Sequence, residues 1–533
     1  MKHAALVVAS LVLTACAKKA GEPGPAAPST WQPALARGLA LPEPAPVARP
    51  APARAPKVAT ARASKVAPVR APKVAPAPTN ENEVTITSKS RAAVEQYKRG
   101  RELVYNARAA EGALHFKKAL ELDPEFALAL AYLGTFTPGI EGVKMVERAV
   151  ELSAPLPGPE RVLIEGQQAF NDNQIERSRA LLGQVAEAKP RDWWVQTLLA
   201  SLDFDDERWQ DCAASAQKAI DVSPRAAPAY NYLAYSLAWQ GRYDKAVAAA
   251  SKQTELLPDE PNPYDTLGEI LLAAGKLDEA QAALEKATAR SARFTSALVA
   301  MAGIRAFKGD WAGAHAALEK AERAAPRALD AIEVRTYEAW ALAAQGKVVD
   351  MLRVHDAIEA KARAEKLHDA AAIAAVDRGL VLALIGQTAD AIAALNAADS
   401  HLDRAHLSPV ALRTRALVGL QARLLAAWKA KKRADAEKLF AALAAEAMKV
   451  PLRRAELSML DWGQGVMALT RGDPARAVQS MKKCSEFDTV CRFMLVSAQR
   501  AAGDEAAAAR TLARLRASPR RDGAYLYFWA TMK

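Results

Sequence analysis

The 533-residue chain has few of the residues from which catalytic and metal sites are built. It contains four cysteines, seven histidines and only 6% aromatic residues. It has no phosphate-binding loop, dinucleotide fingerprint, zinc-protease motif or nucleophile elbow, which argues against the common enzyme classes that use them. His401 and His406, with Asp403 between them, come closest to a metal cluster, but their five-residue spacing turns helical side chains apart. We therefore expect no catalytic residues, no cofactor and no metal.

The N-terminal apolar run, Ala4–Leu13, is too short to cross a bilayer. It follows a positively charged start and precedes small residues, which predicts a secretory signal peptide over residues 1–15. Leu13-Thr14-Ala15-Cys16 resembles the lipobox of bacterial lipoproteins. That resemblance implies diacylglycerol on Cys16, acylation (palmitate) of the new terminus, and an outer-membrane location facing the periplasm. An ordinary signal peptide with a chance cysteine remains the alternative.

Residues 16–80 form the next segment, which cannot build a core. Residues 17–80 hold 14 of the chain's 30 prolines and carry ten Lys or Arg against two Glu, a charge of +8 out of +12. This composition predicts a disordered, extended tether behind the lipid anchor. Its charge fits contact with the cell wall or another anionic surface, or serves only to keep the linker soluble. Because the chain is expected to be exported, we expect no nucleic acid partner.

A 34-residue period organises the middle of the chain. Prolines lie 34, 34 and 68 residues apart, at Pro190, Pro224, Pro258 and Pro326. Small residues recur where two helices must approach closely, namely Ala200, Ala234, Gly268 and Ala302, and then Cys212, Ala246, Ala280 and Ala314. Glycines at the expected turns, Gly241, Gly275 and Gly309, supply the permissive backbone that a tight connection needs.

This pattern resembles the tetratricopeptide repeat (TPR) family. The resemblance implies an all-α fold, an α-solenoid in which about twelve antiparallel helix pairs form a right-handed superhelix. It also implies that the first helix of each pair lines a concave groove that binds other proteins. Gln253, which occupies a position that is small in the other units, departs from the pattern.

The period divides the chain into segments. A regular TPR array is expected over residues 81–328, because the spacing holds there apart from a slip near Ser153–Pro159. Gly346 falls three residues later than the period predicts, so residues 329–451 are expected to form divergent helical repeats. Residues 452–533 return to TPR-like repeats, and the apolar stretch Tyr525–Trp529 is expected to cap the stack as a final helix.

The resemblance assigns a set of side chains to the concave face. Two aromatic rings, an amide and two carboxylates among them would suit an extended peptide. Trp239 and Phe204 could instead be core residues. The candidate peptide groove consists of Trp194, Thr197, Phe204, Asn231, Tyr235, Trp239, Asn262, Asp265 and Glu269.

The remaining cysteines have structural interpretations. Cys212 occupies a small core position and is expected to replace alanine there. Cys484 and Cys491 flank a predicted turn and form a candidate disulfide in an exported protein, with two packed thiols as the alternative.

Together these features predict a non-enzymatic, lipid-anchored scaffold of the bacterial cell envelope that binds a protein or peptide partner. Assembly of envelope, secretion or pilus machinery is the role that the TPR resemblance implies. An adaptor or regulator of cell-wall enzymes, and a glycan-handling enzyme in the divergent region, remain as alternatives. The second requires carboxylates or histidines gathered in one cavity.

Overall fold

The computed structural model describes residues 82–106, 108–137, 139–405, 407–449 and 453–532. The predicted signal peptide, the lipid-anchored Cys16 and the tether lie outside the described residues, as does His406. In the described ranges the secondary structure is entirely helical, with 25 helices and no strand.

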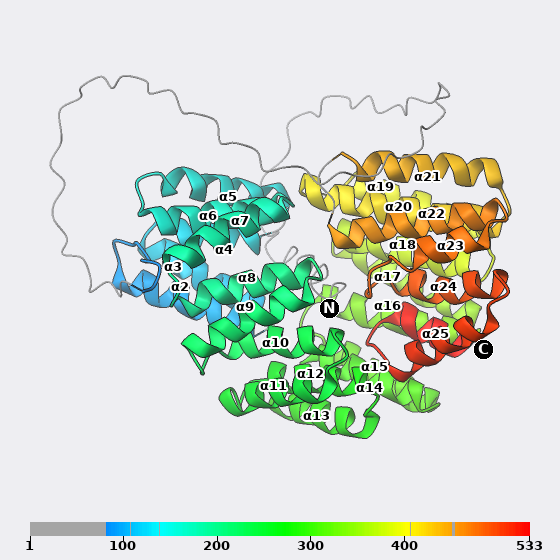
Figure 1. Ribbon diagram of the computed structural model, residues 1–533, viewed down its shortest axis with the longest axis horizontal. Helices are drawn as coiled ribbons and strands as arrows, with labels where there is room; N and C mark the ends of the chain where they lie inside the picture. The colour runs from blue at the N-terminus through cyan, green and yellow to red at the C-terminus, as the bar shows by residue number, and fades with distance from the viewer. Residues whose placement is uncertain (1–81, 107, 138, 406, 450–452, 533) are drawn as a thin grey trace, which may run out of the picture. The chain divides into compact units, whose positions relative to one another are not determined.

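The helices form twelve consecutive pairs followed by one last helix, and successive pairs stack on one another (Figure 1). The first six pairs are α2 (Arg91–Tyr105) and α3 (Ala109–Leu122), α4 (Ala127–Thr135) and α5 (Gly139–Ser153), α6 (Gly158–Asn171) and α7 (Ile175–Ala188), α8 (Trp193–Asp205) and α9 (Trp209–Val222), α10 (Ala227–Trp239) and α11 (Tyr243–Leu256), and α12 (Pro261–Ala273) and α13 (Leu277–Arg290). The all-α solenoid predicted from the sequence is therefore confirmed.

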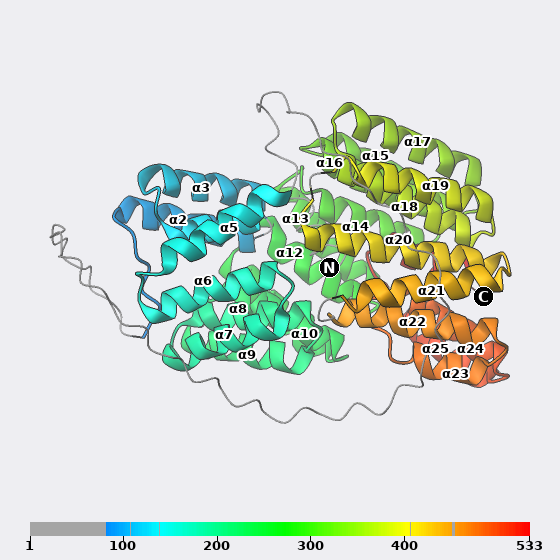
Figure 2. The ribbon, with the colours of Figure 1, turned by 90° about the horizontal axis from the view of Figure 1, so that it is seen from above.

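The second half continues the stack (Figure 2). Its pairs are α14 (Thr295–Phe307) and α15 (Trp311–Ala324), α16 (Ala328–Ala344) and α17 (Val348–Ala364), α18 (His368–Leu384) and α19 (Thr388–Leu402), α20 (Pro409–Lys429) and α21 (Arg433–Ala447), α22 (Arg454–Thr470) and α23 (Pro474–Met481), and α24 (Thr489–Ala501) and α25 (Glu505–Ala517). The final helix is α26 (Gly523–Thr531). Between Ala328 and Leu384 three helices have 17 residues each, against 13 or 14 in α8–α15.

The turn glycines have the conformation that their positions require. Gly241, Gly275 and Gly309 have φ angles of 73°, 76° and 82°, in the left-handed region that favours glycine. In two other pairs Asn173 and Glu207 take this conformation instead, with φ angles of 63° and 59°. These turns reverse the chain within two or three residues and make each pair antiparallel.

Small side chains hold the pairs together. Ala246 and Ala280 are fully buried, and a Cβ added to Gly268 would lie 2.6 Å from Leu284 Cγ. Cys212 is a fully buried free cysteine at the equivalent place. Gln253, the departure seen in the sequence, is also fully buried, and neither polar atom of its amide has a hydrogen-bond partner in the structure. That unpaired amide costs stability that an alanine at this position would not.

The aromatic tail forms α26, with Tyr525, Leu526 and Phe528 buried. The helix packs against α24 at the end of the stack, and also against α14 and α16, which lie about 200 residues earlier. The C-terminal segment thus returns to the middle of the chain. Among the described helices, none is both long and apolar enough to cross a membrane.

Candidate functional site

The predicted groove residues of α8 lie in the core. Trp194 is buried; its indole Nε1 donates a 3.1 Å hydrogen bond to the Tyr132 hydroxyl, and its ring lies 4.5 Å from that of Tyr105. The guanidinium of Arg101 lies over the same indole, 3.9 Å from its centre. Thr197 and Phe204 are also buried. In this structure these three side chains are therefore part of the packing between helices.

On α10 and α12 the groove residues pair with one another. Asn231 Nδ2 donates a 2.8 Å hydrogen bond to Thr266 Oγ1, and the Tyr235 hydroxyl donates to the Glu269 carboxylate. Asp265 is buried and accepts a 2.8 Å hydrogen bond from Ser296 Oγ. Asn262, at the start of α12, is half-buried. Polar groups from three successive first helices therefore meet on one surface.

A single arginine near the C-terminal end of the chain forms ion pairs with the carboxylates of both Asp265 and Glu269. Arg521 Nη2 lies 2.6 Å from Glu269 Oε1, and its Nη1 donates to Asp265 and to Ser296. All three charged side chains are largely buried; that of Arg521 is 14% exposed. Burial raises the pKa of Asp265, as does the neighbouring charge of Glu269, and Arg521 opposes both. We call this cluster of Arg521, Asp265, Glu269 and Ser296 the arginine site.

Trp239 contacts the same C-terminal part of the chain. The Arg520 guanidinium lies 4.4 Å from its ring centre, and the Phe487 ring packs edge-on at 4.6 Å. Ser518 Oγ donates a 2.7 Å hydrogen bond to the carbonyl of Ala273 at the end of α12. Residues 518–522, which are not helical, therefore lie along α10, α12 and α14 and cover much of the predicted groove.

The sequence did not single out Arg520 and Arg521. The available signal was two adjacent arginines, opposite in charge to Asp265 and Glu269, between the last repeat and the aromatic tail. The repeat pattern gives no information on which residues more than 200 positions apart will meet.

Cys484 and Cys491 are joined by a disulfide, with 6.4 Å between their Cα atoms. The bond links the end of the α23 region to the start of α24, and Asp488 between them caps α24 by accepting from the Cys491 backbone N–H at 2.9 Å. The carboxylate of Asp488 lies within 4.8 Å of both sulfur atoms, but bonded sulfurs offer no thiolate to a metal.

Removing this disulfide is expected to lower the free energy of unfolding by about 2–3 kcal/mol, because the bond restricts the unfolded chain. The test compares urea unfolding of the wild type with that of the Cys484→Ala and Cys491→Ala double variant. Intact mass with and without reductant checks the bond itself, and free thiols at both positions in the purified protein would contradict it.

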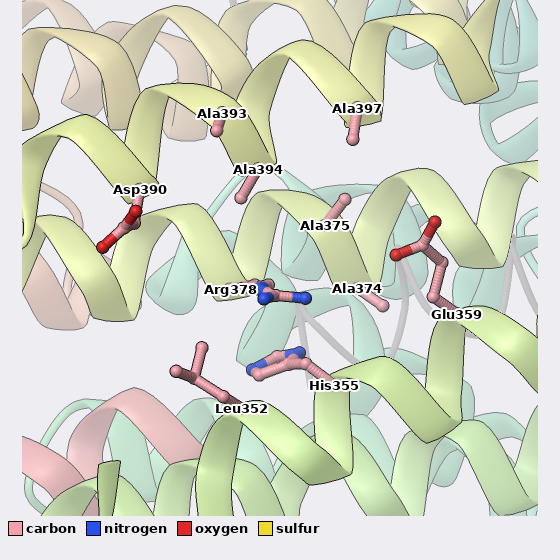
Figure 3. Close-up of a pocket in the computed structure, with 10 residues that line it drawn as sticks. All are labelled: Leu352, His355, Glu359, Ala374, Ala375, Arg378, Asp390, Ala393, Ala394 and Ala397. Atoms are coloured by element: carbon pink, nitrogen blue, oxygen red, sulfur yellow. The ribbon is translucent and has the colours of Figure 1, made fainter. Parts of the chain in front are cut away.

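A cavity of about 400 Å³ lies between α17, α18 and α19 (Figure 3). His355 is 2% exposed, and neither of its ring nitrogens has a hydrogen-bond partner. Figure 3 shows its imidazole beside the guanidinium of Arg378, with Glu359 and Asp390 at opposite ends and alanines of α18 and α19 forming the walls. Burial, with a further contribution from Arg378, lowers the pKa of His355 to about 4, so the ring is neutral at pH 7.

The divergent region thus gathers two carboxylates and a histidine in one cavity, which is what the glycan-handling alternative requires. Their partners are structural, however. Glu359 accepts from Arg363 at 2.7 Å and lies 3.5 Å from His401 Nε2, while Arg378 pairs with Asp356 at 2.7 Å. None of the ten lining residues is a serine, threonine or cysteine. The cavity can offer hydrogen bonds to a ligand, but glycoside hydrolysis uses two carboxylates, and that of Glu359 is already paired with Arg363.

The buried His355 makes stability sensitive to acid. Its folded pKa of about 4 lies below the ordinary 6.5, so folding releases a proton and the stability present at pH 7 is lost as the pH falls through this window. We expect His355→Leu to reduce the loss of unfolding free energy between pH 7 and pH 4.5 by about 2 kcal/mol. Urea unfolding of both proteins at both pH values measures this difference. An unchanged pH dependence in the variant would contradict the assignment of the acid sensitivity to His355.

Comparison with known proteins gives one match within the repeats. Residues 262–293, which span most of α12 and α13, match the tetratricopeptide repeat. The TPR match thus falls on the pair that carries Asp265 and Glu269. No curated protein matches the sequence.

Several solved TPR and related structures resemble the chain in fold. Yeast Tom70 is 14% identical, covers 80% of this chain and 96% of its own, and has a TM-score of 0.41. YrrB, described as a TPR protein with an unusual peptide-binding site, is 17% identical over 36% of this chain and 97% of its own, with a TM-score of 0.27. PilW, described as a type IV pilus biogenesis factor, is 16% identical over 39% of this chain and 92% of its own, with a TM-score of 0.32.

Proposed function

We propose that the chain is a non-enzymatic protein-interaction scaffold of the bacterial cell envelope, anchored by lipid on Cys16. Its concave face on α10, α12 and α14 binds a protein or peptide partner. The supporting observation is that this face already holds a non-helical polypeptide segment, residues 518–522, through the arginine site and through Arg520 on Trp239. A surface with this chemistry suits a second segment of the same kind.

The chemistry of the face specifies the partner's side chains. Asp265 and Glu269 favour a guanidinium, which forms paired hydrogen bonds with carboxylates, and the face of Trp239 favours a second cation. A partner that presents arginines in an extended segment therefore competes with residues 518–522 for the same contacts.

Copurification tests the proposal. The tagged full-length chain, extracted from membranes in mild detergent, is expected to retain a defined envelope protein. Arg520→Ala weakens the hold of the C-terminal segment on Trp239 and is expected to increase the amount retained several-fold. Recovery of no reproducible envelope protein with either form would contradict the scaffold function.

The lipid anchor has its own test. Cys16→Ala is expected to release the protein from the membrane fraction, since the acyl chains provide the attachment. Unchanged membrane association of this variant would contradict the anchor without bearing on the concave face.

An adaptor of cell-wall enzymes is the second candidate, favoured by the +8 charge of residues 17–80. The adaptor function predicts two results that the scaffold function does not. The retained proteins would be wall enzymes, and the full-length chain would sediment with isolated cell wall in a salt-sensitive manner.

A further inference from the structure

A second hollow, of about 530 Å³, lies between α24, α25 and the turn that precedes α24. Its floor consists of Arg492, Leu495 and Gln499, one face of α24. Arg492 is 8% and Gln499 5% exposed. The side-chain oxygen of Gln499 is buried without a hydrogen-bond partner. That oxygen is inaccessible to solvent, so it belongs to the packing around α24 and is not a contact point of the hollow.

The rim is positively charged. Lys482, Arg510 and Arg514 are exposed and line the hollow, and the two arginines lie one helical turn apart on α25. None of the three forms an ion pair with another described residue. The single carboxylate in the lining belongs to Glu486, which already accepts hydrogen bonds from Arg492. Three cations therefore converge on the hollow without an anion to balance them.

The positive charge around the hollow also acts on Arg492, in its floor. Burial lowers the pKa of the Arg492 guanidinium, and the charges of Arg514 and Arg520 lower it further, while Glu486 opposes them. Such repulsion between like charges is relieved by an anion placed among them. The hollow thus has the electrostatics of an anion site.

We infer that this hollow binds a phosphate monoester. A phosphate monoester has nearly two negative charges and three acceptor oxygens, which match three unpaired cations better than a carboxylate does. Leu495 supplies the apolar surface against which the carbon skeleton lies.

The disulfide fixes the geometry of this site. Lys482 and Glu486 lie on the segment that the Cys484–Cys491 bond ties to α24, and Arg492 follows Cys491 directly. Arg492 Nε also donates a 3.1 Å hydrogen bond to the Ser485 carbonyl. The rim cation and the floor are therefore held together by a covalent link.

Calorimetric titration of the full chain with glycerol 3-phosphate and with methyl phosphate, at low ionic strength, tests the inference. Both are expected to bind, because each carries the phosphate group that the cations around the hollow attract. Arg514→Ala is expected to weaken the binding of glycerol 3-phosphate about tenfold, because one charge-assisted contact is lost.

Arg476→Ala is the matched control, since Arg476 is an exposed arginine on α23 outside the hollow. It is expected to change both affinities less than twofold. The inference is overturned if the wild type binds neither phosphate at about 1 mM, or if Arg476→Ala weakens binding as much as Arg514→Ala does. Either result leaves the proposed scaffold function untouched, because that function uses α10, α12 and α14.

Discussion

Replacing Arg521 with alanine is expected to lower the free energy of unfolding by about 3–5 kcal/mol. The variant leaves the carboxylates of Asp265 and Glu269 buried without their cation, and both lie within 3.2 Å of the guanidinium in the wild type. It also releases residues 518–522 from α12 and α14. Urea unfolding of the two proteins at pH 7, followed by circular dichroism, gives the difference.

Two controls separate the charge effect from lost packing. Arg323→Ala removes an exposed arginine paired with Glu319 and is expected to cost less than about 0.5 kcal/mol. Adding Asp265→Asn and Glu269→Gln to Arg521→Ala removes the unpaired charges and is expected to restore part of the stability. An Arg521→Ala protein as stable as the Arg323→Ala protein would mean that the arginine site contributes nothing to the free energy of unfolding.

The pH dependence of stability is expected to show a second large effect, from Glu333 on α16. Burial, with Asp330 adding to it, raises the pKa of Glu333 to about 8, while Arg327 and Arg521 oppose the rise. The folded protein therefore binds a proton that the unfolded chain, with the ordinary value of 4.5, releases. Stability from this group is fully present below pH 4.5 and is lost as the pH rises through about 8.

Glu333→Gln keeps the shape of the side chain and cannot ionise. We expect it to be more stable than the wild type by about 4 kcal/mol at pH 9 and equal to it near pH 4.5. Urea unfolding of both proteins between pH 4.5 and pH 9 measures the difference in their free energies of unfolding. A constant difference between the two proteins at all pH values would show that Glu333 does not titrate in this window.

The repeat pattern was sufficient to predict the helix pairs because each pair depends on local contacts. Ala246 and Ala280 are small where neighbouring helices cross, and Gly241 and Gly275 have the left-handed backbone that their turns need. In a solenoid each unit packs on its neighbours, so a period read from one unit transfers to the next.

The contacts that cover the concave face could not be predicted in this way. Arg521 meets Asp265 across 256 residues, and that contact depends on the twist accumulated over several pairs, which no single repeat encodes. Trp194 shows the same limit: its position in the repeat indicates the groove, yet it is buried because Tyr105 and Arg101 of α2, three pairs earlier, cover its ring. The cavity around His355 likewise depends on how three helices of the divergent region pack together.

Site-specific photo-crosslinking in cells tests the central claim, that the concave face of the repeats receives a protein partner. A crosslinker at Asn262, half-buried at the start of α12, is compared with one at Val349, which is 63% exposed on α17. We expect the crosslinker at Asn262 to give a discrete crosslinked protein and the one at Val349 to give none. We also expect Arg520→Ala to increase the amount of the product formed at Asn262. No discrete product at Asn262, or the same products at both positions, would contradict it.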